Sequence, residues 1–455
     1  MVTTTGRDTG RALVPLAATL LVGAVAALLD TTIVAVALDD LGRDLGAPVG
    51  AVQWVTTAYV LAMTAVIPLV GWSVGRFGAR AVWGAALLLF LAGSVLTGLA
   101  WSPASVVAFR VVQGLGGGMI LPLTQLVLAR AAGPERLGRV MGAVGLVGQL
   151  APVSGPVLGG FLVDGWGWRW IFFVNVPLVL VALLMTWRWF PRDDRRERAP
   201  LDAVGLALLP TAVVLLLYAL SSAETGFRTA SWVSLVGGAG LLAAYVTRSV
   251  RHGGTGLIDL RLFRDRGFRG GALMMFVLGV TTWGPMFLLP LYFQRERGLD
   301  AFDAGLALAP QSAGTALALL VAGRLTDRMP PRPLALAGLA VATLGTLPFV
   351  TGSGPALLAA ALFVRGVGFG VASLPISVSL YRTVAERSIP DATGAGNVIQ
   401  RIGAATGTAL MALILQVTTF ATALTWMLAL TALGLAASVL LPGRKRPRPE
   451  IEEIR

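Results

Sequence analysis

Apolar segments long enough to cross a membrane make up most of this chain. Of its 455 residues, 56% are hydrophobic and only 13% are charged, whereas about a quarter of the residues in a soluble domain carry charge. A helix needs about 20 apolar residues to cross a hydrocarbon core of roughly 30 Å, because each residue rises about 1.5 Å. The sequence therefore predicts an all-α polytopic membrane protein.

Fourteen segments meet this length requirement. We expect transmembrane helices at residues 13–38, 50–70, 81–100, 105–128, 140–163, 168–188, 203–222, 231–247, 270–293, 302–323, 333–351, 355–378, 398–417 and 420–441.

The chain also repeats itself once. Gly71–Arg80 has a counterpart at Gly323–Arg332, and Gln113–Gly118 has one at Arg365–Gly370. Both pairs are separated by 252 residues (323 − 71 and 365 − 113). Sequence-similar halves in a membrane protein predict two helical bundles that rock about a shared central site.

The repeat divides the chain into parts. Six spans precede an inserted pair near 203–247 and six follow it, and an even insertion leaves the two halves in the same orientation. We expect a cytoplasmic tail at 1–12, a six-helix bundle at 13–190, a linker with two additional helices at 191–268, a second six-helix bundle at 269–441 and a cytoplasmic tail at 442–455.

The net charge of +13 at first suggests a nucleic-acid partner, but its distribution argues against one. With the N-terminus inside, 29 of the 36 basic residues fall in inner loops, inner span ends or termini, and two, Arg110 and Arg365, fall within spans. This positive-inside bias predicts a multi-pass protein of the bacterial inner membrane with both termini in the cytoplasm. The five outer-loop residues are Arg43, Arg169, Arg228, Arg295 and Arg297.

Several kinds of chemistry are excluded by composition. Without cysteine, the chain has no disulfide and no thiolate-bound metal, and its single histidine, His252, lies in a basic loop. The only lysine, Lys445, is in the C-terminal tail, so no phosphate-binding loop is present and ATP is not expected as the fuel. No soluble part is large enough to house an active site. We expect neither an enzyme nor a cofactor or metal site.

Asp30 is the one acidic residue well inside an expected span. A carboxyl at bilayer depth costs about 2.5–3.5 kcal/mol on insertion scales, so it usually faces a cavity and serves a function. It could carry a proton between the two sides or act as counter-ion to a cationic substrate. Alternatively, it is a structural acid paired with an arginine or capped by Thr31 and Thr32.

Arg110 opens a glycine-rich run near the start of the fourth span. We expect it to face the interior and to tune the protonation of a nearby carboxyl, while Gln113 faces the substrate cavity. Gly114 and Gly118 would let a neighbouring helix approach closely. Arg365 heads the matching run of the second half and is either a cavity residue or a structural partner of backbone carbonyls.

Two further groups of residues are candidates for gating. The fifth span carries Gly155, Pro156, Gly159 and Gly160, and an internal proline kinks a helix, which suits a helix at the moving boundary of the halves. The short loop between spans two and three resembles a tight gate turn, and its second copy holds a charge pair that could lock one conformation. These residues are Gly71, Arg76, Gly78 and Arg80, then Gly323, Asp327 and Arg328.

The remaining cavity candidates are mostly aromatic. They would line a site for lipophilic molecules, although such residues often serve helix packing alone. They are Trp54, Tyr59, Trp283, Tyr292 and Asn397.

Taken in order, these motifs resemble the fourteen-span drug:H+ antiporter family of the major facilitator superfamily. The resemblance covers nearly the whole chain and implies proton coupling through Asp30, proton transfer through Arg110 and export rather than import. The family usually has Asp at Gly75, Asn and Pro at Ala35 and Asp39, and Gly at Ala151. The motifs are Leu29–Leu38, Gln53 with Trp54 and Tyr59, Arg110–Pro122, Gly155–Gly160 and Trp168–Pro177.

We therefore expect a secondary active exporter, an antiporter driven by the proton motive force. It would export lipophilic drugs or antibiotics, cationic ones included, by alternating access. Its partners would be a small-molecule substrate, protons and the lipid bilayer, and it would be monomeric. The alternatives are a proton-coupled importer of a small metabolite, a channel, and a non-transporting membrane receptor or scaffold.

Overall fold

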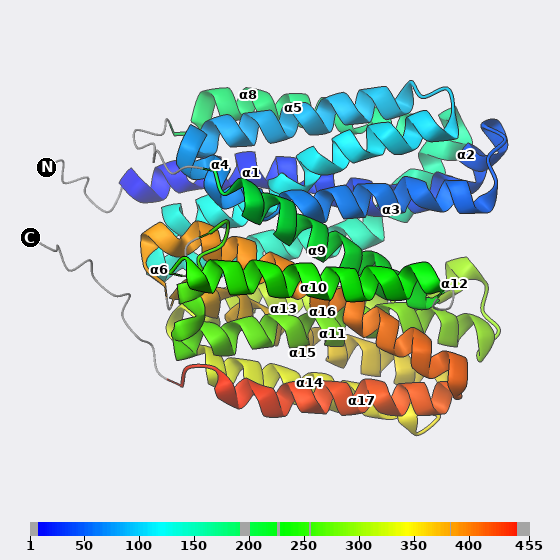
Figure 1. The fold of residues 1–455 in the computed structure, drawn as a ribbon. Coiled ribbons are helices and arrows are strands. Elements are labelled where there is room, and N and C mark those ends of the chain that lie inside the picture. The colour runs from blue at the N-terminus through cyan, green and yellow to red at the C-terminus, as the bar shows by residue number, and fades with distance from the viewer. Residues whose placement is uncertain (1–7, 192–200, 225–227, 254–255, 383, 444–455) are drawn as a thin grey trace, which may run out of the picture. The chain divides into compact units, whose positions relative to one another are not determined.

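The computed structural model describes residues 8–191, 201–224, 228–253, 256–382 and 384–443, and every regular element in these ranges is a helix (Figure 1). The chain divides into two compact units. The first comprises residues 1–132 and 147–201, and the second comprises residues 133–146 and 202–455. The domain boundaries expected from sequence stay a prediction.

The first unit contains α1 to α8, apart from one section of α6. In Figure 1, α5 and α8 lie side by side. The helices are α1 (Asp8–Ile33), α2 (Leu38–Asp44), α3 (Val49–Val66), α4 (Leu69–Phe77), α5 (Ala79–Gly98), α6 (Pro103–Trp166), α7 (Trp170–Phe173) and α8 (Asn175–Trp189), with a 3₁₀ turn at Val34–Ala37.

The second unit contains the inserted helix pair and the second half of the repeat. The inserted helices α9 and α10 pack on each other, as do α14 and α17 (Figure 1). Its helices are α9 (Ala203–Ser221), α10 (Thr229–Arg251), α11 (Arg266–Arg295), α12 (Ala301–Ala307), α13 (Ala309–Arg328), α14 (Pro331–Val350), α15 (Pro355–Arg382), α16 (Ile389–Val417) and α17 (Phe420–Ala437).

The helix α6 is broken at Gly133, whose φ of 65° and ψ of 176° are not helical. The part before the break is the expected fourth span. The part after it begins in the second unit, with residues 133–146, and continues in the first unit from residue 147.

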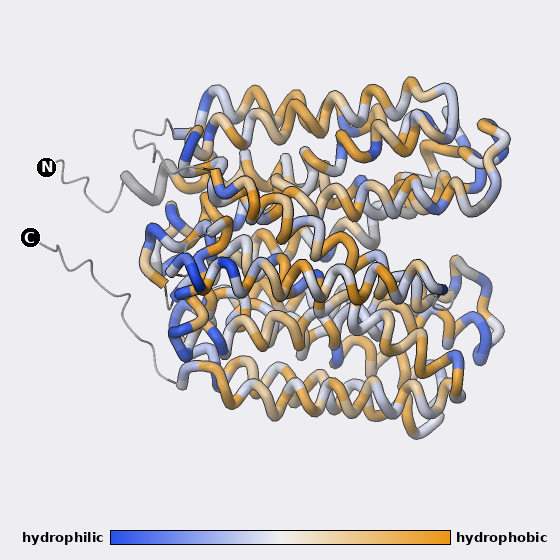
Figure 2. Tube along the Cα trace, in the orientation of Figure 1, coloured by the Kyte–Doolittle hydropathy of each residue, from blue (hydrophilic) through white to orange (hydrophobic). Residues whose placement is uncertain are grey.

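Long apolar helices confirm a multi-pass membrane protein. Twelve helices among the described residues are long and apolar enough to span a bilayer, or thirteen when the bent pair Gly50–Val66 and Leu69–Phe77 counts as one span. Hydrophobic residues run along these helices and hydrophilic ones gather near their ends (Figure 2). The other expected span, 140–163, lies in the second part of α6, where only Val157–Trp166 counts as an apolar helix. The number fourteen stays a prediction.

Packing inside each unit repeats with the spacing found in the sequence. A Cβ added to Gly118 would lie 2.1 Å from the Met63 carbonyl oxygen, and one added to Gly370 would lie 2.7 Å from that of Thr315. Both members of this contact are shifted by 252 residues (370 − 118 and 315 − 63). Three further contacts recur with the same spacing. Gly93 meets Gln113 as Gly345 meets Arg365, Gly114 meets Tyr59 as Gly366 meets Gln311, and Gly116 meets Phe90 as Gly368 meets Ala342.

The expected gate loop after the second span is shorter than the sequence suggested. Gly71 and Arg76 lie within α4, and the turn into α5 is made at Gly78, whose φ is 88°. Because only glycine adopts this conformation without strain, one residue is enough to reverse the chain. Arg80 then anchors the start of α5 by donating to the Trp187 carbonyl oxygen at 2.9 Å.

Asp202 caps α9 and ties it to α10. Its carboxylate accepts from the Gly205 amide at 2.9 Å, which caps α9, and pairs with Arg248 of α10 at 2.9 Å. Burial alone would raise the pKa of Asp202, but the hydrogen bonds from Gly205 and Arg248 outweigh it and hold that pKa below its usual value. The two inserted helices are therefore tied together at this end.

We predict that Gly118→Ala destabilises the protein by about 1–3 kcal/mol, because the new methyl group meets backbone atoms of α3 that cannot move aside. The control is Gly84→Ala in α5, where nothing lies within 4 Å of the added Cβ. Thermal unfolding of both variants in detergent checks this. A Gly118→Ala protein that melts with or above the control would contradict the packing.

Candidate functional site

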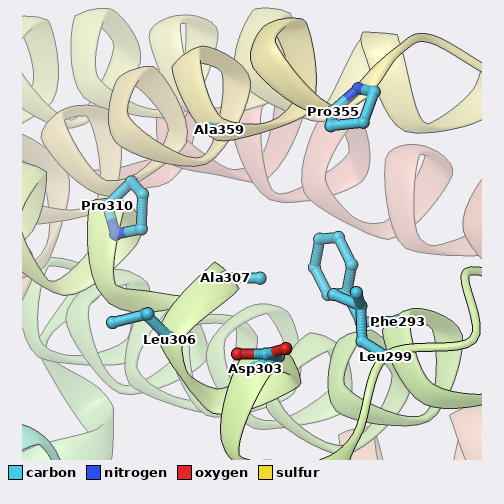
Figure 3. Close-up of a pocket in the computed structure, with 8 residues that line it drawn as sticks. All are labelled: Phe293, Leu299, Asp303, Leu306, Ala307, Pro310, Pro355 and Ala359. Carbon is cyan, nitrogen blue, oxygen red and sulfur yellow. The ribbon is translucent and has the colours of Figure 1, made fainter.

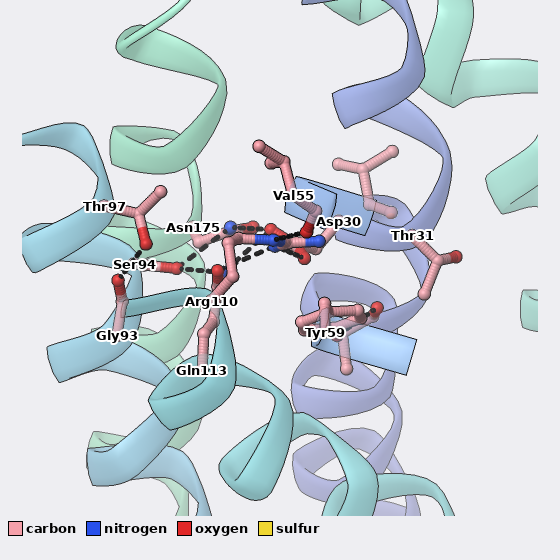
Figure 4. A network of polar contacts seen from close by, with 12 residues as sticks. Asp30, Thr31, Val55, Tyr59, Gly93, Ser94, Thr97, Arg110, Gln113 and Asn175 are labelled. Atoms are coloured by element: carbon pink, nitrogen blue, oxygen red, sulfur yellow. Dashed lines mark hydrogen bonds and ion pairs between the residues drawn. The ribbon is translucent and has the colours of Figure 1, made fainter. Parts of the chain in front are cut away.

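The deepest acidic residue is Asp30, in the last turns of α1. Among the described acidic residues, it alone is buried as a whole residue, with no exposed surface. Three donors surround it: Arg110 Nη1 reaches Oδ2 at 2.6 Å, while Gln113 Nε2 and Asn175 Nδ2 reach Oδ1 at 2.8 and 3.0 Å (Figure 4). The side chains come from α1, α6 and α8.

Arg110 is held as tightly as the carboxylate. Its Nε donates to the Val55 carbonyl oxygen at 3.2 Å and its Nη1 also donates to Gln113 Oε1 at 2.7 Å. Its guanidinium lies over the Tyr59 ring, 3.9 Å from the centroid, with the Phe172 centroid 5.6 Å away. Since Val55 and Tyr59 belong to α3, a fourth helix joins the site.

Ser94 of α5 completes the network. Its hydroxyl oxygen accepts from Gln113 Nε2 at 2.6 Å and from Asn175 Nδ2 at 3.1 Å. Asn175 Oδ1 is buried and has no hydrogen-bond partner in the described structure. This oxygen can therefore accept one further hydrogen bond, either from a water molecule or from a neighbouring group that gains a proton.

The chemistry of this network follows from its charges. One acid and one base are buried together, and the other partners are neutral. Removing one member of such a pair costs about 3–5 kcal/mol, because the other charge stays buried without compensation. Five helices therefore share one buried ion pair.

The sequence analysis found part of this site. Asp30, Arg110, Gln113 and Tyr59 are brought together as neighbours, although Tyr59 and Gln113 were expected to line the substrate cavity. Thr31 and Thr32 do not cap Asp30, because their hydroxyls donate to backbone carbonyls: Thr31 to Leu28, and Thr32 to Leu29 and Ala151.

Sequence analysis missed Asn175 and Ser94. Asn175 begins α8 and lies inside the Trp168–Pro177 motif, where a single amide in an apolar stretch was the available signal. Ser94 had no such signal, because a serine within a span can satisfy itself with its own helix backbone.

The other expected cavity residues are divided between the two units, with Trp54 in the first and the rest in the second. Trp54 and Trp283 are 44% and 47% exposed. Tyr292 packs instead in an apolar cluster of the second unit, with Phe293 and Phe349. Arg365 and Asn397 are buried in that unit, and Asn397 donates to the Thr393 carbonyl of its own helix at 2.9 Å.

Asp327 forms the main contact among the expected gating residues. It accepts from the backbone amides of Gly138 and Arg139 at 2.7 and 3.3 Å, and it pairs with Arg139 Nε at 3.0 Å. The expected charge pair with Arg328, which is exposed at the end of α13, stays a prediction. The carboxylate binds backbone amides in the helix that follows Gly133.

The glycines of the expected gate pack closely against neighbouring backbone. A Cβ on Gly323 would lie 3.0 Å from Arg139 Cα, and in the first unit one on Gly155 would lie 2.0 Å from Thr32 Oγ1. Gly159 packs on Ile33, whereas Gly160 faces open space. The side chain of Pro156 lies outside the described residues.

A pocket of about 360 Å³ lies in the second unit, between α12, α13 and α15 (Figure 3). Apolar side chains and the carboxylate of Asp303 surround it. None of the expected cavity residues is among those that line it, which are Phe293, Leu299, Asp303, Leu306, Ala307, Pro310, Pro355 and Ala359.

Comparison with known families decides the class. The profile of the Major Facilitator Superfamily matches residues 20–408. The chain belongs to the Major Facilitator Superfamily. Like other proteins of this superfamily, it is a membrane transporter and not an enzyme.

Relatives within the superfamily are named for drug resistance. The chain is 37% identical over 399 residues to the multidrug resistance protein B homolog of Mycobacterium tuberculosis, covering 86% of this chain and 74% of the relative. It is 29% identical over 409 residues to the lincomycin resistance protein LmrB of Listeria monocytogenes, covering 89% and 86%. These relatives support a multidrug efflux type of transporter.

Solved structures confirm the superfamily fold. The human organic anion transporter MFSD10 superposes with a TM-score of 0.69 at 15% identity, covering 94% of this chain and 99% of that one. The proton:xylose symporter XylE gives a TM-score of 0.67 at 14% identity, covering 94% and 95%.

We predict that Asp327→Asn speeds amide hydrogen exchange in residues 138–146, because the neutral side chain loses the pairing with Arg139 and accepts the two amides less strongly. The measurement is exchange followed by mass spectrometry. Arg328→Gln, at the exposed end of the same helix, is the control. Equal protection in the two variants would show that Asp327 does not hold this segment.

Proposed function

We propose that this transporter is a proton-coupled exporter of lipophilic drugs or antibiotics. The observation that carries the proposal is the buried pair of Asp30 and Arg110, enclosed by neutral donors and acceptors from five helices. A single titratable acid at that depth is costly unless its charge is used. The multidrug and lincomycin resistance relatives support the substrate class.

The coupling we propose depends on the partner of Arg110. In the arrangement described here the charged carboxylate satisfies the guanidinium. When Asp30 takes up a proton from outside, Arg110 loses its counter-charge and the packing of α1, α3 and α6 around it becomes less favourable. The protonated protein thereby favours a different arrangement, and a proton and a substrate that prefer different states are coupled.

The proton motive force is large enough for this work. Moving one charge across the membrane is worth about 2.3 kcal/mol per 100 mV, before any pH difference is added. No cofactor is needed in this scheme. We place the protein in the inner membrane with both termini in the cytoplasm, on the basis of its arginine distribution, and propose that it acts as a monomer.

Export is preferred to import because of the Gly155–Gly160 motif. This motif resembles one found in exporters. It packs closely on Thr32 and Ile33 of α1, which follow shortly after Asp30. A change at Asp30 can therefore reach this segment through α1. The alternative is metabolite import, which a transport assay distinguishes from export by the direction in which the substrate moves.

We predict that Asp30→Asn abolishes coupled exchange while leaving a folded protein, because the amide still accepts hydrogen bonds but cannot release a proton. The assay uses everted vesicles with a pH-sensitive dye and a panel of drugs, and it records proton movement on substrate addition. Thr31→Ala, one residue away and outside the network, is the control. Substrate-driven proton flux equal to wild type in Asp30→Asn would reject the proposed role.

Arg110→Ala is expected to abolish export and to lower stability by about 3–5 kcal/mol, because Asp30 is left buried without a partner. Arg110→Lys should also lose export, since one ammonium cannot reach Val55, Gln113 and Asp30 at once. A double variant, Asp30→Asn with Arg110→Gln, removes both charges and should recover stability but not export. Full export in Arg110→Ala would reduce Arg110 to a packing residue.

A further inference from the structure

The charges inside the helices of the second unit are all of one sign. Among its described helices, only Arg365 and Arg401 are charged and lie away from the helix ends, ten residues into α15 and twelve into α16 (365 − 355 and 401 − 389). At about 1.5 Å per residue, both are roughly 15–18 Å from an end of their helix. In the first unit, by contrast, Asp30 and Arg110 neutralise each other.

The position of Arg401 corrects the sequence analysis. With a span expected at 398–417, Arg401 falls at the membrane edge and counts among the inner basic residues. The helix α16 actually begins at Ile389, so Arg401 lies deep within it and is partly buried.

Arg365 has only neutral partners in the described structure. It has no exposed surface, its Nη1 donates to Gln311 Oε1 at 2.6 Å, and its Nη2 donates to the Thr281 carbonyl oxygen at 3.1 Å. The Phe369 ring centroid lies 4.7 Å from the guanidinium carbon. The buried Nε has no hydrogen-bond partner.

Helix packing does not require this arginine. Arg365 occupies the repeat position of Gln113, and both residues meet a glycine of the neighbouring helix in the same way, Gly345 for Arg365 and Gly93 for Gln113. A neutral glutamine therefore satisfies the same close approach in the first unit. The guanidinium adds a buried charge that the fold can do without, at a substantial desolvation cost.

The two arginines flank one short stretch of α11. Thr281 accepts from Arg365, and a Cβ added to Gly279, two residues earlier, would lie 2.4 Å from the Gln400 carbonyl oxygen, next to Arg401. The segment of α16 that carries Arg401 therefore packs on the part of α11 that Arg365 contacts. Gln311 accepts a hydrogen bond from Arg365 and is only partly buried, so it lies between Arg365 and accessible surface.

We propose that the second unit binds an acidic group of the substrate, a carboxylate or a phosphate monoester, through Arg365 and Gln311, with Arg401 strengthening the potential. The inference rests on the proposed export function and gives its substrates a chemical class. Because the guanidinium is planar and has an unused N–H, it can donate hydrogen bonds to two oxygens of such an anion. Asp30 is already neutralised by Arg110, so it does not oppose an anion in the arrangement described.

The binding test compares a lipophilic acid with its neutral derivative. Purified protein in detergent is titrated with pyrenebutyric acid, pyrenebutyl phosphate and pyrenebutyric acid methyl ester, and tryptophan quenching gives the affinities. Wild type should bind at least one of the acids about tenfold or more tighter than the ester. Which acid is preferred distinguishes the carboxylate from the phosphate.

Three variants test the role of Arg365. Arg365→Gln should lose the preference for the acid while keeping the affinity for the ester, and Arg365→Lys should retain only part of that preference. Arg324→Gln, at an exposed position of α13, is the matched control and should behave as wild type. The empty Arg365→Gln protein should also melt at the same or a higher temperature than wild type, whereas loss of a structural arginine would lower it.

Equal affinity for acids and ester, or no binding of the acids, would overturn the proposal, and so would an acid preference that survives Arg365→Gln. None of these results touches the proposed function, which the drug panel and Asp30→Asn test separately. Drug-driven proton flux together with no acid preference would leave an exporter whose substrates are not anionic.

Discussion

The ion pair between Asp30 and Arg110 is the interaction on which the first unit depends. Five helices contribute groups to this network. They supply a carboxylate from α1, a carbonyl and a ring from α3, a hydroxyl from α5, a guanidinium and an amide from α6, and a second amide from α8. A pair this deep persists only when every donor and acceptor around it is nearly satisfied. Losing either charge would therefore disturb the packing of all five helices.

The two units show how a duplicated fold can carry different chemistry. The glycine contacts recur with one spacing, because helix spacing depends on the backbone and on residues that lack a side chain. The charged pair of Asp30 and Arg110 does not recur. Gln113 and Arg365 occupy the same place in the repeat, but one completes a neutral network and the other introduces a charge. Packing thus constrains the fold while leaving these positions open to functional change.

Much of this could be predicted from sequence, for physical reasons. Helix length and hydropathy follow from the thickness of a bilayer, and Asp30 stood out because a charge is rare at such depth. The network around it was only half predicted, since Asn175 and Ser94 are neutral and their roles depend on which helices meet. The predicted span at 398–417 began nine residues after the start of α16, so Arg401 was placed at a span end and not well inside the helix (398 − 389). The pairing of Asp327 with Arg139 joins residues nearly 190 positions apart (327 − 139), which no local pattern reveals.

One continuous helix belongs to both units. After the break at Gly133, residues up to 146 pack with the second unit, where Asp327 holds the first turn, and residues from 147 pack with the first. Gly145 and Gly148 stand on either side of that division. Any rearrangement of one unit relative to the other must bend, twist or release this stretch. In the transport cycle proposed above, this stretch is the part of the chain that has to deform, so stiffening it would be expected to slow the cycle.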